Sequence, residues 1–212
     1  MHTISSLALA ASLGLAAVSA SAQDNVVKLC VTEYVSHSTT NGVTGIGVPP
    51  GADASVGNAT TAIFVYERML TPNIGLELVM GIPPRIHAKA TGSVAFLGDN
   101  VLSAKIVAPT LFVTYHFFDP TAVWRPYVGV GVNYTKFTSV QSSLAPHVEM
   151  GSSTGIAGEV GLSFAINKQI SLFGSVAALK VKSNVVATGT TVLQTTVDFR
   201  PVVYSAGASY AF

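Results

Sequence analysis

Residues 125–137 read Arg-Pro-Tyr-Val-Gly-Val-Gly-Val-Asn-Tyr-Thr-Lys-Phe, and their alternation decides the fold class. Large apolar side chains take the even positions, as at Val128, Val130 and Val132. Small or polar residues take the odd positions: Tyr127, Gly129, Gly131, Asn133 and Thr135. Successive side chains of a strand point to opposite faces, so the stretch predicts a strand with one apolar face. That face would point inward in a soluble sandwich and toward lipid in a membrane barrel.

The composition favours the membrane barrel. Only 10% of the 212 residues are charged, against a usual share of about 25%. After the first twenty residues no uninterrupted apolar run approaches the roughly 20 residues that a spanning helix needs. Only helices and closed barrels satisfy their backbone groups within lipid, so a hydrophobic chain rich in strand-forming residues indicates a barrel.

The first 22 residues are interpreted as a signal peptide, which leaves residues 23–212 for the barrel. Residues 7–18 form an apolar core, and Ala20-Ser21-Ala22 fits a small-residue cleavage site. An N-terminal membrane anchor is the alternative, because the segment before the apolar core carries no Lys or Arg. An export signal followed by a barrel predicts passage through the periplasm to the outer membrane of a Gram-negative bacterium.

Alternating segments and turn signals predict eight strands. They cover residues 26–35, 60–70, 74–82, 103–118, 125–137, 154–166, 170–181 and a last strand that ends at Phe212. Long connections at 37–59, 83–101, 138–153 and 182–195 are expected to be loops, and they alternate with short turns. This rhythm is typical of an all-β, eight-stranded antiparallel up-and-down transmembrane β-barrel with both termini in the periplasm. Alternation is weak in 26–35, 60–70 and 170–181, so their faces stay open.

Aromatic residues support the same assignment. Near the short-turn end lie Tyr115, Phe117, Trp124, Tyr127, Tyr210 and Phe212. An interfacial girdle is expected at this level of a membrane barrel. A soluble sandwich would instead need a polar outer face on each strand, and the faces opposite the apolar ridges are small and sparsely charged.

Several motifs resemble the OmpW family of small outer-membrane proteins. They are Thr71-Pro72-Asn73-Ile74-Gly75-Leu76-Glu77-Leu78, Pro83-Pro84-Arg85-Ile86-His87, Ala108-Pro109-Thr110-Leu111, Tyr115-His116-Phe117, the stretch 125–135 and the ending 204–212. The resemblance covers about residues 66–137 and 155–212, and it is poor in the first strand and the long loops. It implies a narrow, largely hydrophobic channel that takes up small hydrophobic solutes. It also implies that Phe212 resembles a signal for the barrel-assembly machinery, and outer-membrane lipids and lipopolysaccharide are expected partners.

Inward positions of the predicted strands give the candidate channel lining. It comprises Glu77, Thr114, His116, Tyr127, Gly129, Gly131, Asn133, Thr135 and Glu159. An ionised carboxylate in a small barrel needs a partner or water, so Glu77 and Glu159 either pair with a lumen cation or guide a solute. Arg68 and Lys136 are the cations considered. The glycines, together with Gly75, Gly81, Gly155 and Gly161, either widen the lumen or relieve crowding.

Other function classes find little support in the sequence. His87 and His116 have no second His or Cys at ligand spacing, so no metal site is expected. No Ser, His and acid arrangement indicates catalysis, so we expect neither an enzyme nor a cofactor. Net charge is +1, which offers no basic field for nucleic acid. Cys30 is the only cysteine, so no intramolecular disulfide can form.

Two functions remain. Apolar patches in two long loops (Gly42, Val43, Ile46, Val48 and Pro49, and Val94, Ala95, Phe96 and Leu97) could form an apolar entrance or pack on their neighbours. The preferred hypothesis is a passive channel for small hydrophobic molecules. The alternative is a plugged structural or adhesive barrel that acts through its external loops.

Overall fold

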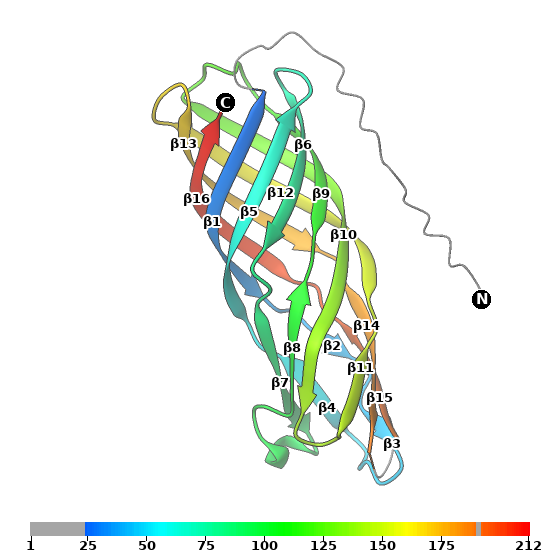
Figure 1. The fold of residues 1–212 in the computed structure, drawn as a ribbon. Coiled ribbons are helices and arrows are strands. Elements are labelled where there is room, and N and C mark those ends of the chain that lie inside the picture. The colour runs from blue at the N-terminus through cyan, green and yellow to red at the C-terminus, as the bar shows by residue number, and fades with distance from the viewer. Residues whose placement is uncertain (1–23, 190–191) are drawn as a thin grey trace, which may run out of the picture.

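A closed antiparallel β-barrel is formed by residues 24–189 and 192–212, which the computed structural model describes (Figure 1). Its strands are β1 (Asn25–Val35), β5 (Ala59–Met69), β6 (Ile74–Gly81), β9 (Thr110–His116), β10 (Trp124–Ser142), β12 (Ser153–Ala165), β13 (Ile170–Leu179) and β16 (Val202–Ala211). Each pairs with the next, and β16 pairs with β1 to close the ring. The predicted eight-stranded barrel is confirmed. The predicted signal peptide lies outside the described residues.

Shorter strands extend the barrel beyond its long-loop end. They are β2 (Thr39–Thr40), β3 (Thr44–Gly45), β4 (Ala52–Val56), β7 (Arg85–Gly92), β8 (Leu102–Val107), β11 (His147–Met150), β14 (Lys182–Thr188) and β15 (Val192–Asp198). A single turn of 3₁₀-helix, η1 (Ala95–Leu97), lies between β7 and β8. The expectation that residues 37–59, 83–101, 138–153 and 182–195 are loops without strands is therefore wrong. No helix among the described residues has the length and apolar character needed to cross a membrane.

The strand expected over residues 103–118 is two strands. β8 ends at Val107 and β9 begins at Thr110, with Ala108 and Pro109 between them. Proline has no N–H to donate to a ladder, so pairing stops there. The long strand β10 bridges the break, because its first half pairs with β9 and its outer half with β8.

Side chains alternate through the barrel wall as the opening stretch predicts. Val128, Val130 and Val132 are exposed on the outside of β10, while Tyr127 and Asn133 are buried inside. The structure also settles the strands whose faces the sequence left open. In β1, Lys28, Cys30 and Thr32 point inward; in β5, Ile63, Val65 and Glu67; in β13, Phe173.

The polarity of the wall reverses along the barrel. In the half that carries the short turns, apolar side chains face outward, and the inward ones include all the buried charged residues beside a few apolar ones such as Ile63 and Phe173. In the extension, β7 buries Ile86, Ala88 and Ala90 and exposes Arg85, His87 and Lys89. On β10 the reversal falls between Thr135 and Phe137, which are both buried. The extension therefore has the polarity of a soluble sandwich, with its own apolar interior.

Both described chain ends lie at the short-turn end of the barrel (Figure 1). Asn25 and Phe212 exchange two backbone hydrogen bonds of 3.2 and 2.9 Å there. Tyr115, Phe117, Trp124, Tyr210 and Phe212 are exposed at this level, as a girdle requires. Tyr127 is not part of it, since its ring is buried inside the barrel and stacks on His116 with 5.1 Å between ring centroids.

Candidate functional site

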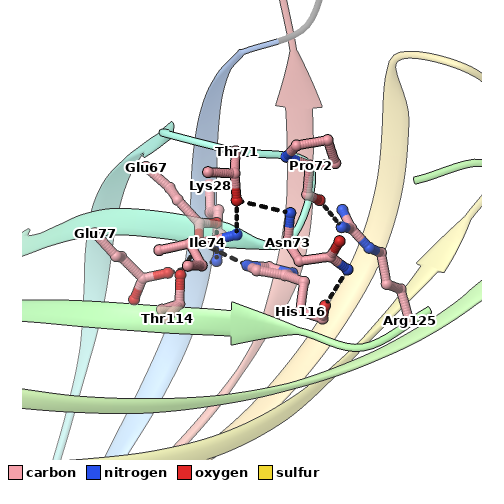
Figure 2. A network of polar contacts seen from close by, with 10 residues as sticks. All are labelled: Lys28, Glu67, Thr71, Pro72, Asn73, Ile74, Glu77, Thr114, His116 and Arg125. Carbon is pink, nitrogen blue, oxygen red and sulfur yellow. Dashed lines mark hydrogen bonds and ion pairs between the residues drawn. The ribbon is translucent and has the colours of Figure 1, made fainter. Parts of the chain in front are cut away.

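An ionic network fills the interior of the barrel near the short turns (Figure 2). Lys28 Nζ lies 3.0 Å from Glu67 Oε2 and 2.5 Å from Glu77 Oε2. All three side chains are almost fully buried. Glu67 and Glu77 are direct cross-strand partners on β5 and β6, an arrangement that is unfavourable for two like charges. Lys28 from β1 lies between them and supplies the opposite charge.

Two polar groups on β9 complete the shell of Glu67. Thr114 donates its hydroxyl to Glu67 Oε1 at 2.5 Å, and His116 Nε2 lies 2.7 Å from the same oxygen. His116 is also stacked on Tyr127, and Lys28 Nζ lies 4.8 Å from the centroid of that ring. A buried carboxylate is tolerated only when it is paired and hydrogen-bonded, and Glu67 meets both conditions.

The turn after β5 is fastened to the same strands. Asn73 donates to the carbonyl oxygens of His116 and Phe118 at 2.7 and 2.9 Å, and Arg125 donates to the carbonyl of Pro72. Thr71 Oγ1 accepts from the backbone N–H of Ile74 at 2.9 Å. Figure 2 shows this turn directly beside the ionic network. The Thr-Pro-Asn motif therefore holds β6 and β9 at the level where their polar side chains meet.

Glycines in this half admit large neighbours instead of opening the lumen. A Cβ at Gly161 would collide with the ring of Tyr127. A Cβ at Gly75 would lie 2.5 Å from Glu67 Oε1, and one at Gly129 would lie 2.9 Å from Glu159 Cγ. The hypothesis that these glycines widen the channel is wrong at these levels, because the space they leave is occupied.

Glu159 stands at the edge of the network with an oxygen that has no partner. The side chain is buried, and its Oε1 accepts no hydrogen bond from the described residues. A cavity of about 40 Å³ adjoins it and is also lined by Lys28, Glu77 and Tyr127. We use the name polar cluster for Lys28, Glu67, Glu77, Thr114, His116, Tyr127 and Glu159.

A smaller polar layer lies further along β10. Asn133 Nδ2 donates to Thr110 Oγ1 at 2.7 Å, and Thr135 donates to Asn133 Oδ1 at 2.6 Å. All three side chains are buried. These bonds satisfy the last inward polar groups of β10 before Phe137, the next inward residue of that strand, which is apolar.

Beyond this layer the interior is an apolar chamber. Its lining includes Val56, Ile86, Phe137, Val181, Val197 and Phe199. The rings of Phe137 and Phe199 stack with centroids 5.4 Å apart. The chamber comprises an inner cavity of about 40 Å³ and an outer one of about 110 Å³, and Val56, Ile86 and Phe199 line both. Tyr34 and Leu179 line both the inner cavity and the cavity of the polar cluster, so the spaces follow one another along the barrel.

The residues predicted to line the channel all belong to the inward faces, but they split into two groups. Glu77, Thr114, His116, Tyr127 and Glu159 meet in the polar cluster, with Gly129 against Glu159. Asn133 and Thr135 form the smaller layer, and a Cβ at Gly131 would collide with the carbonyl oxygen of Leu111. Whether any of them lines a solute path stays a prediction.

The expected cation partners of the carboxylates are wrong. Arg68 binds Asp24, with 3.6 Å between Nη2 and Oδ2, and Lys136 is exposed on the outside of β10. The partner is Lys28, whose facing the sequence leaves open because a lysine disturbs the apolar alternation of the first strand. Glu67 was missed for the same reason on β5. The charges of Lys28 and Glu67 were themselves the available signal. A barrel interior tolerates a charged side chain and the lipid face does not, so both residues are expected to point inward.

The described residues contain no candidate metal site. Within residues 24–189 and 192–212 no group of three or more His, Cys, Asp and Glu side chains could hold an ion.

A closed eight-stranded barrel with an apolar outer belt, an aromatic girdle and a polar interior defines a small outer-membrane barrel protein. The OmpW family model matches residues 22–212, so the chain belongs to the OmpW family. Outer membrane protein W of Vibrio cholerae is 28% identical over 222 residues, covering 100% of this chain and 99% of that relative. Outer membrane protein AlkL of Ectopseudomonas oleovorans is 28% identical over 169 residues, covering 79% and 73%.

Solved structures agree on the fold. The crystal structure of the outer membrane protein OprG from Pseudomonas aeruginosa superposes with a TM-score of 0.82. It covers 90% of this chain and 96% of that one at 24% identity, which is a likeness of fold alone. The relatives are outer-membrane barrel proteins, and the predicted location in the outer membrane is confirmed.

Proposed function

We propose that this protein admits small hydrophobic molecules through the outer membrane by passive partition and diffusion. The observation that carries the proposal is the apolar chamber, which Val56, Ile86 and Phe199 line at both its inner and outer levels. This apolar interior offers a surface to which apolar solutes partition, in contrast to the polar cluster at the other end of the barrel. An apolar solute gains about 0.8 kcal/mol for each CH₂ group that it transfers from water to such a surface.

The polar cluster affects the route by which a solute would leave the barrel. Lys28, Glu67 and Tyr127 are buried at the short-turn end, where Lys28 contacts both Glu67 and the ring of Tyr127. Passage of an apolar molecule through these ion pairs gains nothing. Exit toward the lipid is therefore favoured over exit along the axis.

A break in the wall supports this sideways route. The β6–β9 ladder ends at the pair Val79 and Thr110, and the β7–β8 ladder begins at the pair Arg85 and Lys105. Between them only the bond from Ile106 N to Pro84 O, at 3.0 Å, spans the two segments. Ile106 and Ala108 in this stretch also line the inner cavity of the chamber. Prolines 83, 84 and 109 lack ladder donors and prevent the gap from closing by pairing.

The test is uptake of a small hydrocarbon by liposomes that contain the pure protein. Phe199→Asn should slow uptake at least about tenfold, because an apolar contact worth about 1.5 kcal/mol or more is lost. Ile166→Asn, an exposed position at the short-turn end, serves as the matched control and should leave uptake unchanged. Uptake by wild-type liposomes no faster than by empty ones would refute the proposal.

A plugged structural or adhesive barrel is the second candidate, and the polar cluster is the observation that favours it. Ile46 and Phe96 protrude from the long-loop end with more than four-fifths of their surface exposed, as an adhesive tip would require. This function predicts no uptake in liposomes and loss of surface binding after deletion of the segment around η1. The two outcomes separate it from the channel.

A further inference from the structure

On the three neighbouring strands β7, β8 and β10, a cationic residue lies just beyond the end of the apolar outer belt. The last outward apolar residues are Ile82 after β6, Val107 on β8 and Tyr134 on β10. The next outward residues toward the long-loop end are Arg85, Lys105 and Lys136, all exposed. We call these three residues the cationic triad.

Strand register brings the triad together. Arg85 on β7 is the direct partner of Lys105 on β8, which in turn pairs with Thr138 on β10. Lys136 is two residues from Thr138 on the same face, so it is the diagonal neighbour of Lys105 at about 7–8 Å. Like charges directly opposite each other destabilise a sheet, so the arrangement requires a counterion.

The described residues do not supply that counterion. Within the described residues the ion pairs involve Lys28, Arg68, His116, Lys182 and Arg200, and none includes a member of the triad. Arg85 Nη1 lies 3.1 Å from Ser103 Oγ and 3.2 Å from Gln141 Oε1, and it donates to both. These bonds hold the guanidinium across β8 and β10 in a fixed position.

We propose that the cationic triad binds the phosphate groups of an anionic glycolipid in the outer leaflet, of the lipid A type. The inference rests on the proposed orientation of the barrel, with its long-loop end outside the cell. Arginine and lysine are the usual ligands of phosphate, and basic groups beside a spanning segment attract anionic lipid. Val107 and Tyr134, directly below the triad, offer an apolar surface to the acyl chains of the same molecule. A free phosphate ion would make no use of that surface.

Lys182 provides a matched control at the same end of the barrel. Its Nζ lies 3.7 Å from Asp198 Oδ2, to which Arg200 also donates at 3.0 Å. Hydrogen bonds from Arg200 hold the pKa of Asp198 below its ordinary value, so this carboxylate is charged at neutral pH. Lys182 is therefore exposed and cationic but already has an anionic partner.

The experiment measures binding of a fluorescent bisphosphoryl lipid A to the full protein in zwitterionic nanodiscs. The double variant Arg85→Gln with Lys105→Gln should weaken binding by roughly fivefold for each cation removed, on the order of 25-fold together. Lys182→Gln should bind as the wild type does. Dephosphorylated lipid A should bind the wild type as weakly as bisphosphoryl lipid A binds the double variant.

A second pair, Lys105→Gln with Lys136→Gln, leaves the hydrogen bonds of Arg85 intact and should show a similar loss. Heat-modifiable gel mobility checks that each variant is folded. Equal binding by folded double variants and wild type would overturn the proposal. Full competition by millimolar inorganic phosphate would also overturn it, since the site would then recognise the anion alone. Uptake of solute is not part of the readout, so failure here leaves the proposed function standing.

Discussion

The two ends of the barrel have opposite polarity, inside and outside. Near the short turns, Lys28, Glu67 and Glu77 are packed in an ionic network, and the outer surface is apolar. Near the long loops, Ile86, Phe137 and Phe199 form an apolar core, and charged residues such as Arg85 and Lys89 are exposed on the outer surface. A wall in lipid must be apolar outside, which leaves the polar side chains for the interior. A wall in water has the reverse requirement. The same barrel therefore carries a rigid polar end and an apolar chamber, and the two should respond differently to mutation.

The largest effect is expected from removal of the network's only lysine. Lys28→Met leaves Glu67 and Glu77 facing each other in a buried site, which should cost about 3–5 kcal/mol of unfolding free energy. Urea titration of the protein in lipid bilayers measures this loss. Lys182→Met breaks an exposed ion pair and should cost less than about 1 kcal/mol. Similar losses for the two variants would mean that the network does not stabilise the barrel.

A medium effect is expected where a glycine admits a side chain. Gly161→Ala places a methyl group in the ring of Tyr127, and such overpacking typically costs about 1–3 kcal/mol. Gly158 lies on the same strand, and a Cβ there would find its nearest neighbour, Gly129 O, at 3.9 Å. Gly158→Ala should therefore be tolerated in the same titration. If both variants are neutral, Tyr127 does not need the space beside Gly161.

A smaller effect is expected at the boundary between the two ends. Thr135→Val removes the hydroxyl that donates to Asn133 Oδ1, and the loss of one such bond should cost about 1 kcal/mol. Thr138, on the other face of β10, provides the control, and Thr138→Val should change stability by no more than about 0.5 kcal/mol. A stability gain in Thr135→Val would place the polarity boundary one layer nearer the short turns.

No effect on uptake is expected from a change confined to the polar cluster. Glu159→Gln keeps the shape of the side chain and replaces a carboxyl group whose Oε1 has no partner by an amide. A solute that leaves the chamber sideways does not pass Glu159, so the uptake rate in liposomes should equal that of the wild type. A marked increase would show instead that solute crosses the cluster along the axis.

The alternation in 125–137, together with the low charge and the rhythm of long and short connections, was sufficient to predict the barrel and the facing of Val128, Val130 and Val132. The reason is that a strand in lipid has a period of two and little tolerance for outward charge. The same alternation occurs in 85–92 with its polarity reversed, although the sequence alone predicts a loop there. Reversed polarity is what an extended wall in water requires, so the signal was present but pointed to a different environment.

The partner of Glu77 could not be chosen from the sequence. Arg68, Lys136 and Lys28 are all cations on strands, and their facing depends on register and on where each strand begins. Lys28 points inward because β1 pairs with both β5 and β16 in the register that closes the barrel. The sequence also could not show what occupies the space beside Gly161, because only the packing of the barrel brings the ring of Tyr127 there.

The sequence by itself determined that the chain forms an eight-stranded outer-membrane barrel, since periodicity and low charge are local properties that survive without knowledge of neighbours. The tertiary structure decided where the interior changes from an ionic network to an apolar chamber. It also decided which cations are paired and which, like Arg85, Lys105 and Lys136, have no carboxylate partner among the described residues. These properties depend on strand register and barrel closure, which bring residues far apart in the chain within a few ångströms of each other.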